Sequence, residues 1–156
     1  MSDTHPGRWR ALALLAVAEL LGMSLWMAVT AIGPRLQLLW TLDASQVGWL
    51  TTAVQLGFVA GTAVSATLNL ADIVPARLLF ASSAVLGAVA NVSLLKAGGY
   101  EGALLARAAT GFFLAGVYPP AMKMASTWFR EGRGLAIGSI VGALTAGKAL
   151  PWLLSG

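Results

Sequence analysis

Three charged side chains lie inside long apolar stretches of the sequence: Glu19, Arg107 and Lys148. An ionisable group in hydrocarbon costs about 2.5 to 3.5 kcal/mol even on the mild insertion scale, so it usually faces a cavity, a partner or a pathway. A carboxyl group there could load and release a proton, and a guanidinium offers a rigid fork of donors for carboxylate, nitrate or phosphate oxygens. These residue types favour a pathway as the first hypothesis.

Each of these residues also has a structural interpretation. For Glu19 the alternatives are a proton carrier, a side chain held by hydrogen bonds from a neighbouring helix, and a group that faces a water-filled cavity. Arg107 and Lys148 either attract an anion or extend their charged ends to the lipid headgroups. Lys123 is expected to anchor at the membrane interface, with a role in an anion path as the alternative. Asn69 and Asn91 are candidate interhelical hydrogen-bonding residues.

The composition indicates the class of protein. Of the 156 residues, 58% are hydrophobic and 10% are charged, whereas a typical soluble domain has about 25% charged residues. We therefore predict an all-α polytopic membrane helix bundle. The net charge of +4 is scattered over expected helix ends, which does not suggest a nucleic-acid partner. With no cysteine and only His5 as a histidine, neither a metal site nor a cofactor is expected.

About five transmembrane helices are expected, because a bilayer core of about 30 Å needs roughly 20 apolar residues in a helix. The predicted spans are residues 11–32, 47–70, 76–95, 103–125 and 135–154, after a cytoplasmic tail of residues 1–10. Gly33 and Pro34 end the first span with a helix stop rather than a signal-peptide cleavage site. Residues 34–45 are expected to form a loop, and Pro119 and Pro120 to kink or break the fourth span.

The positions of lysine and arginine predict the orientation, since short cytoplasmic loops retain positive charges. One side of the predicted bundle has Arg8, Arg10, Arg77, Arg130 and Arg133, with Lys123 close by. The other side has Arg35 and Lys96. We therefore expect a multi-pass protein of the plasma or inner membrane whose N-terminus is cytoplasmic.

Two stripes of small residues recur at every fourth position, which places each stripe on one helical face. They consist of Gly57, Gly61, Ser65 and Asn69 in the second span, and of Gly134, Gly138 and Gly142 in the fifth. Helices in lipid associate through close backbone approach at such residues. Both helices are therefore expected to pack closely against a partner.

The turn after the second span resembles the best-known motif of the major facilitator superfamily, Gly-x-Leu-Ala-Asp-Arg-x-Gly-Arg-Arg. Residues 68–77 read Leu-Asn-Leu-Ala-Asp-Ile-Val-Pro-Ala-Arg. Asp72 and Arg77 match together with the Leu-Ala before the aspartate, whereas both glycines and two arginines are replaced. The charge relay that the family builds around this turn is therefore thinned.

A second family motif lies in the fourth span, where an arginine is followed by spaced glycines and then a proline. Arg107, Gly111, Gly116, Pro119 and Pro120 fit this motif, and Arg133 and Gly134 fit the opening of the family's fifth helix. The resemblance implies a role for Arg107 in substrate binding or proton coupling. Residues 118–147 look most like the nitrate, nitrite and cyanate porters of the family.

The resemblance also implies what the chain needs. Carriers of this family have two six-helix halves with the substrate site between them, and access alternates by rocking one half against the other. About five helices correspond to an incomplete N-terminal half, so a second transmembrane half or self-association is expected. The family's second and fifth helices line the boundary between the halves, where the two small-residue stripes lie.

The leading hypothesis is a gradient-coupled secondary carrier for a small solute, with an anion favoured by Arg107 and Lys148, of which this chain is about half. The alternative is a truncated or degenerate membrane protein that has a structural or assembly role and transports nothing alone. An enzyme is not expected, since no loop contains a catalytic constellation of His, Ser or paired carboxylates. No Walker loop for ATP binding appears either.

Overall fold

Four helices are long and apolar enough to cross a membrane, among residues 6–129 and 131–155, which the computed structural model describes. They are α1 (Arg8–Ala31), α3 (Ala44–Thr67), α5 (Ala76–Ser93) extended by the 3-10 turn η1 (Leu94–Lys96), and α8 (Arg133–Ser155). Large apolar side chains point outward from them, such as Leu14 of α1, which is 72% exposed. An all-α bundle that exposes apolar side chains suits a lipid surround, because helices satisfy their own backbone groups.

The predicted fourth span is present as two shorter helices, α6 (Tyr100–Leu114) and α7 (Tyr118–Trp128). Pro119 and Pro120 lack the N–H groups that would bond to the carbonyls of Ala115 and Gly116, so the α-helical ladder stops there. The turn between the helices uses shorter-range bonds, from the Gly116 N–H to the Phe113 carbonyl at 3.0 Å. The predicted break is confirmed, and the two prolines occupy the first turn of α7.

The expectation of a loop at residues 34–45 is wrong for most of that segment. Residues after the end of α1 form a further helix, α2 (Gly33–Trp40), with Pro34 in its first turn. Proline suits that position, because an N–H there has no partner within the helix. The helix ends at Thr41, whose φ of 51° is left-handed. A second short helix, α4 (Leu70–Ile73), falls in the turn before α5.

The start of α3 is fixed by a reciprocal pair of hydrogen bonds. The Gln46 N–H donates to the Asp43 carboxylate at 2.7 Å, and the Asp43 N–H donates to the Gln46 side chain at 2.9 Å. This capping box satisfies two backbone donors that a helix N-terminus otherwise leaves free. It fixes the beginning of α3 within three residues of the predicted one.

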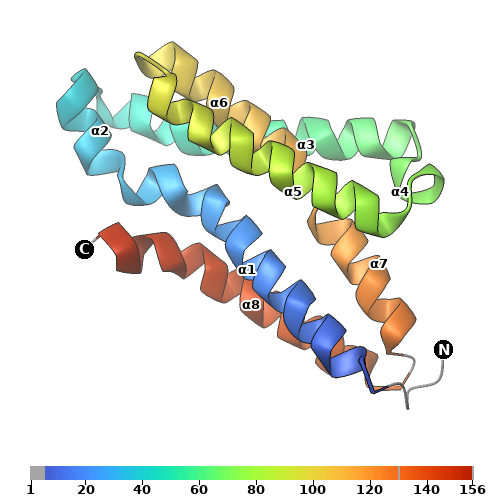
Figure 1. Ribbon diagram of the computed structural model, residues 1–156. Coiled ribbons are helices and arrows are strands. Elements are labelled where there is room, and N and C mark those ends of the chain that lie inside the picture. Colours follow the sequence, from blue (N-terminus) through green and yellow to red (C-terminus); the bar gives the residue numbers. More distant parts are fainter. Residues whose placement is uncertain (1–5, 130, 156) are drawn as a thin grey trace.

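The helices form two groups that α7 connects (Figure 1). In one group α1 packs along α8, and in the other α3 and α5 pack against α6. One apolar core lies between α1, α7 and α8 around Leu12 and Ile140, and another lies between α1, α2, α3 and α6 around Val29 and Leu50. Helix α1 belongs to both cores, and Glu19 and Trp26 lie on it between Leu12 and Val29.

Candidate functional site

Arg107 of α6 is held inside the bundle by acceptors on three other helices. Its side chain is 1% exposed, and it donates to the Leu25 carbonyl at 3.0 Å, the Leu50 carbonyl at 3.4 Å and the Asn91 side chain at 3.3 Å. It also donates to the Trp26 carbonyl. The guanidinium therefore connects α1, α3 and α5 to α6, and Asn91 provides one of the interhelical hydrogen bonds expected of it.

This geometry separates the two interpretations of Arg107. A fully buried guanidinium does not extend to the lipid headgroups, so the snorkelling alternative does not describe this residue. None of its acceptors among the described residues is a carboxylate. The positive charge is therefore balanced only by the dipoles of neutral groups, and it contributes a positive potential to the middle of the bundle.

Glu19 of α1 is fully buried, and neither of its carboxylate oxygens has a hydrogen-bond partner within the described part of the chain. The alternative in which a neighbouring helix holds this group by hydrogen bonds is thus not what the structure contains. Burial without a partner disfavours the charged form of a carboxyl group. Glu19 lies seven residues before Trp26, two turns along the same face of α1.

Lys148 of α8 has an exposed side chain whose charged end approaches Trp26 of α1. Its ammonium nitrogen lies 5.9 Å from the centre of the Trp26 ring, and that ring meets Phe58 of α3 edge to face with centroids 5.2 Å apart. Trp26 thus contacts Lys148 and Phe58 through its ring and Arg107 through its carbonyl. The structure brings two of the predicted cations to one residue of α1.

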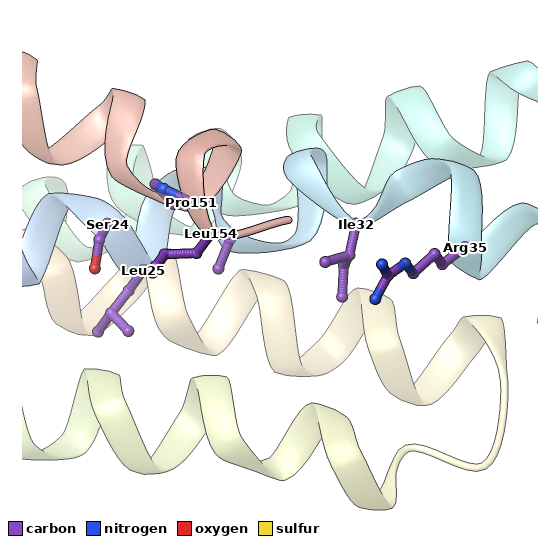
Figure 2. A pocket seen from close by; sticks show the side chains of 7 residues that line it. Ser24, Leu25, Ile32, Arg35, Pro151 and Leu154 are labelled. Atoms are coloured by element: carbon purple, nitrogen blue, oxygen red, sulfur yellow. The ribbon is translucent and has the colours of Figure 1, made fainter. Parts of the chain in front are cut away.

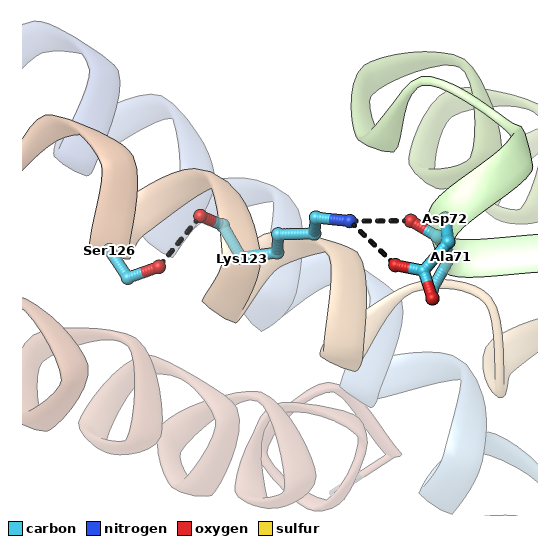
Figure 3. A network of polar contacts seen from close by, with 4 residues as sticks. All are labelled: Ala71, Asp72, Lys123 and Ser126. Atoms are coloured by element: carbon cyan, nitrogen blue, oxygen red, sulfur yellow. Dashed lines mark hydrogen bonds and ion pairs between the residues drawn. The ribbon is translucent and has the colours of Figure 1, made fainter.

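Lys123 of α7 binds the turn before α5 at one end of the bundle (Figure 3). Its ammonium group donates to the Ala71 carbonyl at 2.6 Å and to the Asp72 carboxylate at 3.3 Å, with both side chains at least half exposed. Asp72 is the acidic residue of the family motif, so this contact joins that motif to the second half of the broken helix. Arg77 lies exposed in the first turn of α5.

The two stripes of small residues differ in what they contact. A Cβ added to Gly57 or Gly61 would overlap the backbone of Ala108 or Phe112, and one added to Gly111 would overlap that of Val54. The expected close packing of this stripe is therefore found for these glycines, but their partner is α6 of the same chain rather than a second transmembrane half. Ser65 is half-buried beside a cavity of about 210 Å³ between α3, α5 and α6.

The second stripe is open. Gly134, Gly138 and Gly142 are all exposed, and a Cβ added to any of them would meet no atom within 4 Å. The buried face of α8 instead presents Gly147, which lies against the backbone of Leu20. Arg133, at the start of α8, donates to the Phe129 carbonyl at 3.2 Å and so binds the end of α7.

A cavity of about 330 Å³ lies between α1 and the end of α8, with Arg35 at one side (Figure 2). Its lining is mostly apolar and includes Leu25, Ile32 and Leu154. Leu25 of α1 is on a different helical face from Glu19 and Trp26. The side chains of Glu19, Trp26, Arg107 and Lys148 are therefore not among those that line this cavity.

Trp26 and Phe58 are the site residues that sequence reasoning missed. Each lies in a predicted span, where an aromatic residue is expected to pack against lipid or core. The available signal was position: Trp26 is seven residues from Glu19, and Phe58 is next to Gly57 on a helix with a small-residue face. Their contact with Lys148 depends on how α1, α3 and α8 are arranged, which periodicity does not predict.

Comparison with known proteins matched the chain to a family model and to two curated relatives. The family model described as Major Facilitator Superfamily matches residues 14–156. Two curated relatives, the hexuronate transporters of Escherichia coli K12 and of Escherichia coli O157:H7, are each 27% identical over 153 residues, which is 94% of this chain and 35% of the relative. The chain thus spans about a third of the length of these relatives. No solved structure matches it.

These relatives are named for hexuronate, so the likeness to nitrate, nitrite and cyanate porters stays a prediction without support from them. The superfamily match extends from the first turns of α1 through the broken helix α6–α7 to the end of α8. Because the match includes nearly all of these residues, this chain belongs to the Major Facilitator Superfamily.

Proposed function

We propose that this chain forms one wall of a gradient-coupled carrier for a small organic anion. The observation that carries the proposal is the imbalance of charge around Trp26: two cations approach this residue, and no carboxylate pairs with either of them in the described residues. A positive site in low dielectric favours an anion. The hexuronate transporters among the relatives are named for an anion of this kind.

Glu19 is the proposed proton carrier. A buried carboxyl group that lacks hydrogen-bond partners favours its neutral form and can give up the proton when water or a cation comes near. It lies two turns from Trp26, so an anion bound near the two cations would disfavour the ionised carboxylate of Glu19 and favour its protonated form. Binding of the anion and of the proton would therefore favour each other, and the two would move in the same direction.

The proposed orientation has the N-terminus in the cytoplasm. The start of α1, the start of α5 and the start of α8 have arginines and lie toward one end of the bundle (Figure 1). Arg35 is in α2, which follows the end of α1, and Lys96 is in η1, which follows the end of α5. This asymmetry supports the end with more arginines as the cytoplasmic one.

Uptake into proteoliposomes tests the function. We expect the purified 156-residue chain, once self-associated or assembled with a second half, to accumulate labelled glucuronate when the proton concentration is higher outside, and Glu19→Gln to abolish the stimulation by the gradient. Glucose, which has a similar ring but no charge, serves as the control solute. If neither glucuronate nor nitrate accumulates, transport by this chain on its own is refuted, and the structural role becomes the better description.

The open stripe on α8 supports contact with further helices, either a second copy or a second half. The sequence has no cysteine, so one introduced cysteine reports a single contact. We expect Gly138→Cys to form a disulfide-linked dimer in membranes. Leu105→Cys is the control, because Leu105 of α6 is 74% exposed but lies outside the stripe. Equal cross-linking of the two variants would refute a specific contact at α8.

A further inference from the structure

Lys148 is a cation on a membrane-spanning helix whose charge is not balanced by an acidic side chain of the described residues. Its side chain is exposed, and no carboxylate within ion-pair distance of it is found among residues 6–129 and 131–155. Its contact with the Trp26 ring at 5.9 Å is a weak attraction that a true anion would exceed. The ammonium group therefore has donors to offer to a ligand at this ring.

The Trp26 and Phe58 rings provide an apolar surface next to this cation. Their edge-to-face arrangement fixes the Trp26 ring, and α1 lies between α3 and α8 in Figure 1. Arg107 also donates a hydrogen bond to the backbone carbonyl of Trp26. A ring fixed by both its side-chain and backbone contacts forms a preorganised platform, which lowers the entropic cost of binding.

The α3 wall adds uncharged polar groups. Helical spacing puts Gln55 and Thr62 on the side of α3 that bears Phe58, and both are exposed. The Thr51 hydroxyl on this side already bonds to Thr30 of α1 at 2.9 Å. Gln55 and Thr62 are thus exposed polar side chains on a membrane-spanning helix, and such groups suit the hydroxyl groups of a ligand better than lipid tails.

We infer that Lys148 and Trp26 form the anion subsite of this chain, and that it takes a small ring-shaped carboxylate with hydroxyl groups, such as a sugar acid. Lys148 binds the carboxylate, and the Trp26 ring packs against the aliphatic face of the ligand ring. Gln55 and Thr62 accept hydrogen bonds from the ligand hydroxyl groups or donate hydrogen bonds to them. The inference rests on the proposed function and names the substrate class of the same site. Arg107 acts as a positioning residue, because its donors are already used by protein acceptors.

Ligand titration followed by tryptophan fluorescence tests the subsite in the full chain in phosphatidylcholine nanodiscs. We expect glucuronate to give a saturable change in emission that Trp26→Phe removes and that glucose does not produce. Lys148→Met should raise the Kd at least about tenfold, as for loss of a charged hydrogen bond. Lys148→Arg should restore binding, and Lys96→Met, which removes an exposed lysine from a turn, should leave the Kd within twofold.

The inference is overturned if wild-type chain gives no saturable response, or if Lys148→Met binds glucuronate within twofold of wild type. A phosphate headgroup shares the same anionic chemistry, so nanodiscs with added phosphatidylglycerol form a second arm. A fluorescence change caused by this lipid that glucuronate does not reverse would also overturn it. Binding that depends on Lys148 without any uptake would instead refute only the proposed function, and uptake that ignores Lys148 would refute only the subsite.

Discussion

The contact between α3 and α6 gives the sharpest prediction about stability. Gly57→Ala would place a methyl group against the Ala108 carbonyl, with its carbon 2.8 Å from the carbonyl carbon, where ordinary contacts are 3.4 Å or more. The obstructing atoms are backbone, so the two helices must separate rather than a side chain rotate. Overpacking of this kind costs about 1 to 3 kcal/mol.

A matched substitution isolates this cost from the effect of alanine on helix formation. Alanine favours a helix over glycine by about 1 kcal/mol, and this gain applies equally in the middle of α8. Gly138→Ala has no atom within 4 Å of its new carbon, so it should be neutral or stabilising. The free energy of unfolding should therefore be about 1 to 3 kcal/mol lower for Gly57→Ala than for Gly138→Ala.

The assay is reversible unfolding in mixed micelles, with helicity followed by circular dichroism as the dodecyl sulfate fraction rises. Gly111→Ala would overlap the backbone of Val54 one turn away in the same contact. Once Gly57→Ala has separated the helices, the second substitution should cost less than it does alone. Equal stabilities of Gly57→Ala and Gly138→Ala, within about 0.5 kcal/mol, would refute the reasoning from close backbone contact.

Three further substitutions test the charged groups. Arg107→Lys keeps the charge but cannot reach acceptors on three helices, so the free energy of unfolding in the same micelle titration should fall by about 1 to 3 kcal/mol, and an unchanged value would contradict the clamp. Glu19→Met removes a buried carboxyl group without partners, so it should raise that free energy by about 1 kcal/mol or more while abolishing gradient-driven uptake, and a lower stability would contradict its burial without a partner. Asp72→Asn breaks an exposed ion pair with Lys123, and calorimetry of the variant should show a loss below about 1 kcal/mol.

The sequence predicted the class of fold because the physical constraint is severe. A span needs about 20 apolar residues, and each of the four long helices fills such a stretch. The break in the fourth span was also predictable, since Pro119 and Pro120 remove backbone donors wherever they occur. The helix after Pro34 was missed because proline both ends one helix and suits the first turn of the next.

The candidate site was only partly predictable. Glu19, Arg107 and Lys148 are evident in the sequence because a charge in hydrocarbon is costly, whatever it contacts. Whether a small-residue stripe faces α6 or the outside depends on the rotation of each helix about its axis. Both stripes have the same spacing, so the sequence gives no basis for separating Gly57 from Gly138.

The sequence by itself determined that this chain crosses a membrane as helices and that three of its charges lie within them. It could do so because hydrophobic length and the cost of a buried charge are local properties of the chain. Only the tertiary structure decided that Arg107 is enclosed by acceptors on three helices, that Glu19 has no hydrogen-bond partner among the described residues, and that Lys148 meets Trp26. Those relations join residues far apart along the chain, and they follow from helix rotation and packing rather than from spacing.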